Sequence, residues 1–164
     1  MKKSLLLLIL AIFTLATAFD AKAEWTDRNT FGLKGPVKQV VGNNNYDVYL
    51  EFEENGDIIF EEDPDIYWAF IERDNKGRIT HYPREEYTYN NKGQVTTITI
   101  VGGGRESITK LYYNTKGHVI KEITGGKSTT YTYQKFDSYG NWIKRTAKNK
   151  YGKEVQTRTI TYYE

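Results

Sequence analysis

The stretch YTYNNKGQV, residues 87–95, places a short polar turn between two alternating segments. Similar stretches occur at residues 51–58 (EFEENGDI), 71–79 (IERDNKGRI), 111–119 (LYYNTKGHV) and 134–142 (QKFDSYGNW). In each, ring or aliphatic residues alternate with polar ones, a turn ends in glycine, and an apolar residue stands two positions further on. This pattern is typical of an antiparallel β-hairpin, so the chain repeats one hairpin unit.

The residues of the turn have defined roles. Asn90 suits the first position because its side chain can bond the backbone two residues on. Gly93 suits the fourth position, where a type I turn followed by a bulge requires positive φ. The same reasoning predicts a set of structural turn glycines, of which the first and last belong to looser copies of the turn: Gly56, Gly77, Gly93, Gly117, Gly140 and Gly152.

The hairpins follow one another closely. Further turn signals lie between the units, at 43–45 (NNN), 102–104 (GGG) and 125–126 (GG). No segment shows the 3.6-residue periodicity of an amphipathic helix. Tyr131 and Tyr133 share one strand face, opposite Thr130 and Thr132, and such a sheet must curl to bury its ring-bearing face. The sequence therefore predicts an all-β fold, an antiparallel meander of repeated hairpins forming a curved sheet or an open or small barrel.

The N-terminus is distinct from this pattern. Lys2 and Lys3 precede an apolar run over 5–15, and Ala21-Lys22-Ala23 resembles a cleavage site. These are the three parts of a secretory signal peptide. The run is shorter than the roughly 20 residues that cross a bilayer. We therefore expect a signal-peptide helix at 1–23, a single β domain at 24–164, and a periplasmic or secreted protein.

The composition narrows the class further. The chain has no cysteine, so neither disulfides nor the lipid-modified cysteine of a lipoprotein is expected. It has 23 basic and 21 acidic residues, and 20 of each remain once residues 1–23 are removed. A neutral exported chain gives no reason to expect a nucleic-acid partner. All charged residues over 47–65 are acidic, whereas Lys and Arg dominate from Lys110 onward, so we expect the two charge groups to lie apart.

The repeated stretches resemble the YD-repeat (Rhs-type) motif, in which an aromatic-x-aromatic-Asp segment leads into a turn ending in Gly. The strongest likeness is YQKFDSYGNWIKR at 133–145, and GLKGPVKQV at 32–40 is similar to the opening of small exported YD-repeat proteins of Gram-negative bacteria. Glu53, Asn90 and Asn114 replace the Asp of the motif. The resemblance implies a strand-rich scaffold and supplies no catalytic residue. Large members enclose a toxin, for which this chain is too short.

The sequence contains few candidate catalytic or metal-binding groups. His81 and His118 lie far apart in sequence, and we expect both to be solvated rather than metal ligands. Glu51, Glu53, Asp57 and Glu61 are carboxylates of the kind that glycosidases pair. They belong to a run of acidic residues on strand faces that we expect to face water. We therefore predict no catalytic residue, no metal site and no cofactor.

The function expected from the sequence is that of an exported, non-enzymatic β scaffold that binds a protein or a glycan outside the cytoplasm, without inserting in a membrane. The alternatives are a small-molecule carrier with a closed meander barrel and, less favoured, a glycan-acting enzyme. Trp68 and Trp142 are suited to stacking on a sugar, although core packing is the simpler interpretation. The candidate binding surface comprises Tyr112, Tyr131, Tyr133, Trp142 and Tyr162, with Lys144 and Arg145 at its rim. Otherwise these rings form the core.

Overall fold

The computed structural model describes residues 25–43, 48–59, 70–102 and 105–164. The predicted signal segment lies outside these ranges, as do Glu61 and Trp68. The described chain forms an 11-stranded antiparallel sheet and one short helix, which confirms the predicted all-β meander. The elements are α1 (Asp27–Thr30), β1 (Val37–Asn43), β2 (Tyr49–Glu51), β3 (Glu72–Arg73), β4 (Ile79–Tyr82), β5 (Glu85–Tyr89), β6 (Val95–Gly102), β7 (Arg105–Tyr113), β8 (Val119–Thr124), β9 (Lys127–Phe136), β10 (Trp142–Asn149) and β11 (Gly152–Tyr162).

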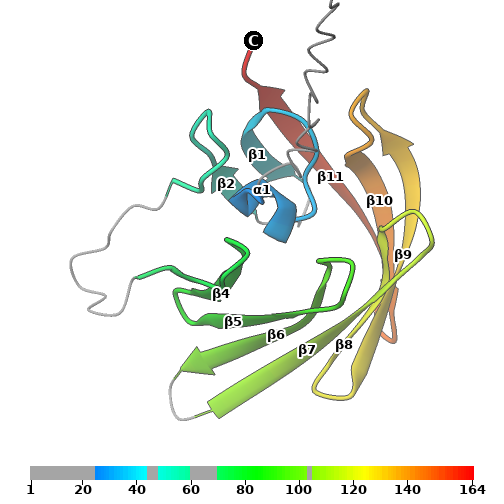
Figure 1. Cartoon of the computed structure of the whole chain (residues 1–164). Coiled ribbons are helices and arrows are strands. Elements are labelled where there is room, and N and C mark those ends of the chain that lie inside the picture. Colours follow the sequence, from blue (N-terminus) through cyan, green and yellow to red (C-terminus); the bar gives the residue numbers. More distant parts are fainter. Residues whose placement is uncertain (1–24, 44–47, 60–69, 103–104) are drawn as a thin grey trace, which may run out of the picture.

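The sheet is curved but not closed (Figure 1). Strands β3 to β11 follow one another in sequence order, and β1 then pairs with β11, so that β2 and β3 are the two edges. Strand β2 and the turn after it contain the acidic residues Glu51, Glu53, Glu54 and Asp57, and only β1 separates β2 from β11, which contains Lys153 and Arg158. The expectation that the acidic and basic parts of the chain lie apart is wrong, because the first strand of the chain pairs with the last.

Four of the repeated turns lie along one side of the sheet, here named the turn rim: 74–77, 90–93, 114–117 and 137–140. In each, the side-chain oxygen of the first residue accepts hydrogen bonds from the backbone N–H groups of the third and fifth residues. The predicted positive φ is present, for example +78° at Gly93 and +81° at Gly140. Gly152 differs: its turn connects β10 to β11 at the opposite side of the sheet.

A tyrosine of each unit is bonded to the unit before it. The hydroxyl of Tyr89 donates to the carbonyl of Ile79, that of Tyr113 to Val95, and that of Tyr133 to Val119, each at 2.6 Å. Each acceptor stands two residues after the glycine of the preceding turn. The ring-rich segments therefore link consecutive units.

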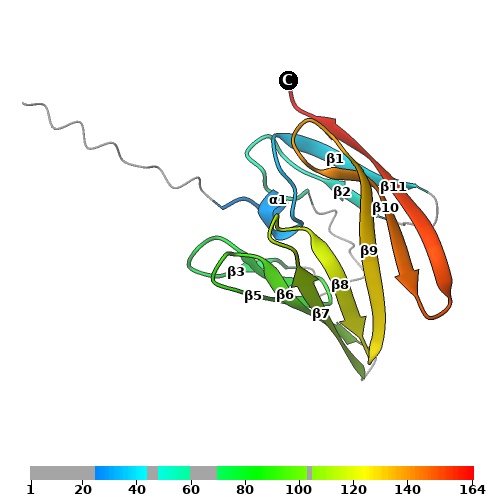
Figure 2. The same cartoon turned by 90° about the vertical axis from the view of Figure 1, so that its right-hand side faces the viewer.

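The segment 25–36 lies against the turn rim. A β-carbon added to Gly93 would lie 2.6 Å from the ring of Trp25, and one added to Gly56 would lie 2.6 Å from Thr26. The other end of the segment reaches the 137–140 turn, where Lys34 lies near Gly140. Figures 1 and 2 show α1 at this side of the sheet, close to β1 and β2.

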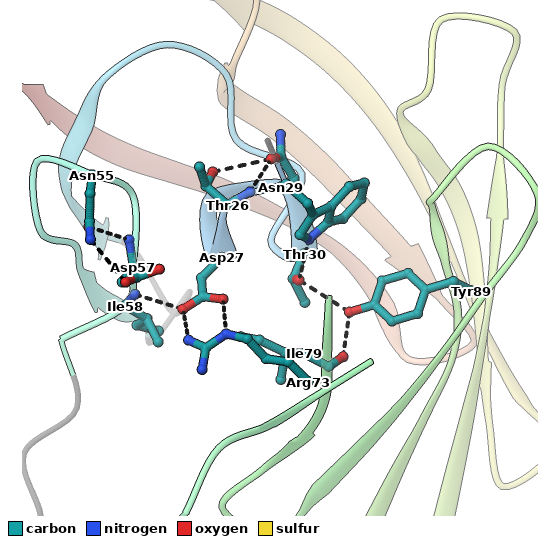
Figure 3. A network of polar contacts seen from close by, with 11 residues as sticks. Thr26, Asp27, Asn29, Thr30, Asn55, Asp57, Ile58, Arg73, Ile79 and Tyr89 are labelled. Atoms are coloured by element: carbon teal, nitrogen blue, oxygen red, sulfur yellow. Dashed lines mark hydrogen bonds and ion pairs between the residues drawn. The ribbon is translucent and has the colours of Figure 1, made fainter. Parts of the chain in front are cut away.

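Asp27 of α1 connects the two edges of the open sheet (Figure 3). Its carboxylate accepts a hydrogen bond from the backbone N–H of Ile58, which follows β2, and pairs with the guanidinium of Arg73 in β3. Thr30, at the end of α1, shares a hydrogen bond with the hydroxyl of Tyr89. Helix α1 therefore acts as a clasp across a gap that no strand pairing closes.

The main apolar core lies beneath this clasp. Its buried residues come from the 33–58 segment (Leu33, Val37, Val40, Phe52, Ile58) and from β4 to β6 (Ile79, Tyr87, Val95). The buried Arg28 donates hydrogen bonds to the carbonyls of Val37, Glu53 and Glu54. Burial lowers the pKa of this guanidinium. The N-terminal segment thus supplies both apolar side chains and a cation to the closure of the sheet.

Candidate functional site

The structure does not bring the seven predicted surface residues together. Trp142 and Arg145 are buried, with 8% and 9% of their surfaces exposed. Tyr112 is exposed but alternates with Leu111 and Tyr113, so it lies on the other face of β7 from them. Lys144 is exposed, whereas Tyr131, Tyr133 and Tyr162 are half-buried. The seven residues therefore do not form one continuous surface.

The buried members form a stack of rings and guanidinium groups. The guanidinium of Arg145 lies 3.9 Å from the ring centre of Tyr131 and 4.2 Å from that of Trp142. Arg158 lies 4.0 Å from Trp142, and its Nε donates to the Trp142 carbonyl. The Nε of Arg145 donates to Gln156. Desolvated cation–π pairs of this kind stabilise the fold. This part of the predicted surface is an internal packing element.

Two hollows lie side by side along the turn rim and share Asn114. The first, named the amide hollow, has a volume of about 520 Å³ and lies between the turns 90–93 and 114–117. Four side-chain amides line it, together with the exposed ring of Tyr112. Those amides belong to Asn90, Asn91, Gln94 and Asn114. Amides donate and accept hydrogen bonds at once, which suits a ligand rich in hydroxyl groups.

The second hollow, named the His118 hollow, has a volume of about 350 Å³ and lies between the turns 114–117 and 137–140. Its lining includes Lys34, Lys116 and His118. The imidazole of His118 packs on Phe136, with ring centres 4.7 Å apart, and on Tyr133, at 5.2 Å. The hollow therefore combines basic groups with aromatic faces.

His118 is the least satisfied polar side chain of this site. Its Nε2 is covered and has no hydrogen-bond partner among the described residues. Burial lowers the pKa of His118, and the charges of Lys34 and Lys116 lower it further, while a hydrogen bond with the backbone of Gly140 opposes the shift. The expectation of a solvated histidine is wrong here, because the next hairpin covers the ring. His81 stacks on Phe70 with ring centres 5.1 Å apart.

The acidic candidates contribute to neither hollow. Glu51 accepts a hydrogen bond from Tyr49, and Asp57 accepts one from Asn55. Neither hollow has a carboxylate in its lining. Within the described ranges, no three His, Cys, Asp or Glu side chains come together as a metal site would require. The helix in the described ranges has four residues, so no described segment is a helix long enough to span a membrane.

Comparison with known proteins adds no relationship. No protein-family model matches the chain, and no curated protein matches it. The likeness to YD-repeat proteins therefore stays a prediction based on the repeated motif.

One repeated feature of the sequence predicts the polar residues of the turn rim, although the candidate binding surface above did not include them. The third position of three turns is a lysine: Lys76, Lys92 and Lys116. Since equivalent positions of a hairpin repeat lie on the same side of a sheet, these lysines and the amides beside them had to come to one rim. Lys34 could not be placed this way, because it reaches the rim from the N-terminal segment.

Proposed function

We propose that this chain is an exported, non-enzymatic binding protein, built from YD-like hairpins, that binds an extended saccharide along its turn rim. The observation that carries the proposal is the pair of adjoining hollows, which spans three successive turns. Turns on one rim are two strands apart, about 10 Å. The three turns that border the two hollows therefore span roughly 20 Å, the length of several sugar residues.

The linings suit a saccharide in two ways. The Oδ1 atoms of Asn90 and Asn114 already accept two backbone hydrogen bonds each within their turns. The amide of Asn91 and the amide N–H groups of Asn114 therefore provide the hydrogen-bonding groups for sugar hydroxyls. The rings of Tyr112 and Phe136 are 44% and 38% exposed, which leaves apolar faces for sugar C–H groups. These features occur at regular spacing because each belongs to a repeated turn, as in other repeat proteins that bind extended ligands.

The rival functions fit these hollows less well. A closed carrier needs an enclosed interior, whereas the sheet is open and both hollows face solvent. A glycan-cleaving enzyme needs two carboxylates flanking the bond that breaks, and the hollow linings contain none. Both points support binding without cleavage.

A glycan array that includes neutral and acidic oligosaccharides tests the proposal. We expect binding to at least one extended oligosaccharide, and a loss of about tenfold in affinity for Tyr112→Ala, equal to the ~1.4 kcal/mol that one ring face can supply. Tyr151→Ala is the matched control, since Tyr151 is 75% exposed and lies in the turn at the opposite side of the sheet. Equal affinities of Tyr112→Ala and the unchanged protein, or binding only to proteins, would contradict the proposal.

Export has a separate test. The proposal places the protein outside the cytoplasm because residues 1–23 have the three parts of a signal peptide. N-terminal mass spectrometry of the protein from cells of a Gram-negative host should find a chain beginning at Glu24 in the periplasm or medium. An intact Met1 in the cytoplasm would contradict this part of the proposal.

A further inference from the structure

The His118 hollow is basic and lacks a counter-charge. Lys34, Lys116 and His118 line it, and no Asp or Glu does. The ion pairs formed within the described residues join Arg73 to Asp27 and Arg78 to Asp74, so neither lysine of the hollow takes part in one. Burial lowers the pKa of His118, and the repulsion among the three basic groups around this small volume lowers it further.

The backbone of Lys34 is held in place by the fold. The backbone N–H of Lys34 donates to Asn141 Oδ1, and Asn141 Nδ2 donates to the Lys34 carbonyl. Asn141 is only 2% exposed, so this pair of bonds fixes the N-terminal segment to the last turn of the rim. Lys34 Nζ lies 3.7 Å from the position that a β-carbon of Gly140 would occupy. Its ammonium group is therefore directed over that turn.

Two further residues of the lining are aromatic. Phe136 and Tyr133 stack with ring centres 5.6 Å apart, and both contact the imidazole of His118. A sugar ring can lie on the exposed part of Phe136 while an anionic substituent lies near the lysines. A basic group beside an aromatic face therefore fits a sugar that carries a carboxylate better than a neutral one.

We propose that the His118 hollow is a subsite for the carboxylate of an acidic sugar residue, with Lys34 and Lys116 as its charged ligands. The inference rests on the proposed binding of a saccharide along the turn rim. The amide hollow then takes the adjoining residue of the same chain through its hydroxyl groups. The carboxylate supplies the counter-charge that the hollow lacks, and its binding favours the charged form of His118 over the neutral form.

The experiment compares acidic oligosaccharides with their methyl esters, which have the same sugar rings without the charge. Pairs of uronic-acid and sialic-acid-type oligosaccharides, each with its ester, and hexaglutamate are titrated against the purified protein by calorimetry. We expect at least one acid to bind about tenfold or more tightly than its ester, the gain expected for a charge-assisted hydrogen bond. Lys34→Gln combined with Lys116→Gln should remove that difference, and Lys150→Gln at the opposite side of the sheet should retain it.

The two histidines provide a second measurement. In NMR titrations, the bound acid should raise the pKa of His118, which lies near Lys34 and Lys116 and packs on the Tyr133 ring, and leave the resonances of His81 unchanged. Equal binding of acid and ester to both the unchanged protein and the double variant would overturn the subsite and leave saccharide binding intact. Equal binding of hexaglutamate would overturn the sugar as its occupant. No binding to any member of any pair would overturn both proposals.

Discussion

The hydroxyl of Tyr113 donates a 2.6 Å hydrogen bond to the backbone carbonyl of Val95, in the preceding hairpin unit. Tyr89 and Tyr133 make the equivalent bond to Ile79 and Val119. These three tyrosines, each in the strand that leads into a turn, therefore join consecutive units by a hydrogen bond and also supply ring surface for packing. An unpaired buried carbonyl is costly, so this bond explains why tyrosine is used where phenylalanine would pack equally well.

Replacement of this tyrosine by phenylalanine tests the bond. Tyr113→Phe keeps the ring and removes the hydroxyl, so we expect a loss of about 1 kcal/mol in the free energy of unfolding. Urea denaturation measures it. Tyr112→Phe, on the adjacent exposed ring, is the control and should change stability very little. Equal stability of the Tyr113→Phe variant and the unchanged protein would show that water replaces the hydroxyl at no cost.

Tyr113 and Tyr162 predict a loss of stability in alkali. Burial raises the pKa of Tyr113 to about 12, and burial with a hydrogen bond to Asp137 raises that of Tyr162 to about 12. A raised pKa means that the folded state favours the protonated phenol. The stabilisation is complete below the unfolded value near 10 and is lost as pH rises from about 10 to about 12. Denaturation midpoints across this range should fall less steeply in Tyr113→Phe.

Two turn glycines should differ in their tolerance of alanine. Both Gly93 and Gly140 have positive φ, which costs alanine about 1 kcal/mol. At Gly93 the new β-carbon would also lie 2.6 Å from the ring of Trp25, whereas at Gly140 the nearest atom is Lys34 Nζ, at the van der Waals distance of 3.7 Å. We expect Gly93→Ala to cost about 2 kcal/mol or more and Gly140→Ala about half of that. Thermal unfolding of the two variants gives the comparison, and equal losses would mean that the Trp25 contact is unimportant.

The clasp gives a fourth prediction. Asp27 is 1% exposed and bonds both Ile58 and Arg73. Asp27→Asn keeps the shape but removes the charge that pairs with Arg73, so we expect a loss of about 3 kcal/mol. Asp57→Asn, on an exposed neighbour, should be nearly neutral. Hydrogen exchange should show faster opening near β2 and β3 than in β8 to β10. Uniformly faster exchange would instead mean that the sheet opens as one unit.

Acid should destabilise the protein through His118. Its pKa is lowered by burial and by the charges of Lys34 and Lys116, and Tyr133 is the other titratable group against it. The folded state thus favours the neutral imidazole, and stability falls as pH falls from about 6.5 toward the lowered pKa. His118→Gln should flatten this part of the stability profile, and His81→Gln should leave it unchanged. An identical slope in both variants would assign the acid transition to other groups.

Local features of the fold could be predicted from the sequence, because their causes are local. The Asn90–Gly93 spacing determines a turn through bonds between neighbouring residues. The position of Arg145 could not be predicted in the same way. Simple alternation pairs Trp142 with Lys144 on one face, but the strand register shifts between Trp142 and Arg145, which places Arg145 inside. A bulge of one residue moves every later side chain of the strand to the opposite face of the sheet. The sequence around the bulge has no pattern that indicates it.

The candidate site was predictable only in part for a different reason. Asn90, Asn114 and Lys116 come from the repeat, whereas Lys34 and Asn141 meet across 107 positions of sequence. The pairing of β1 with β11 brings them together. Neither segment alone indicates the other as its partner, because their contact depends on the order of the strands in the complete sheet.

The clasp also limits how many units the array can hold. One carboxylate reaches both Ile58 and Arg73 because the two sheet edges come within the span of a single side chain. Insertion of one further hairpin would add two strands and move the edges apart by about 10 Å. Asp27 would then reach one edge only. An open repeat can be lengthened unit by unit. In this sheet the 25–36 segment sets the distance between the two edges, so the gain or loss of a hairpin in evolution would require a change in that segment at the same time.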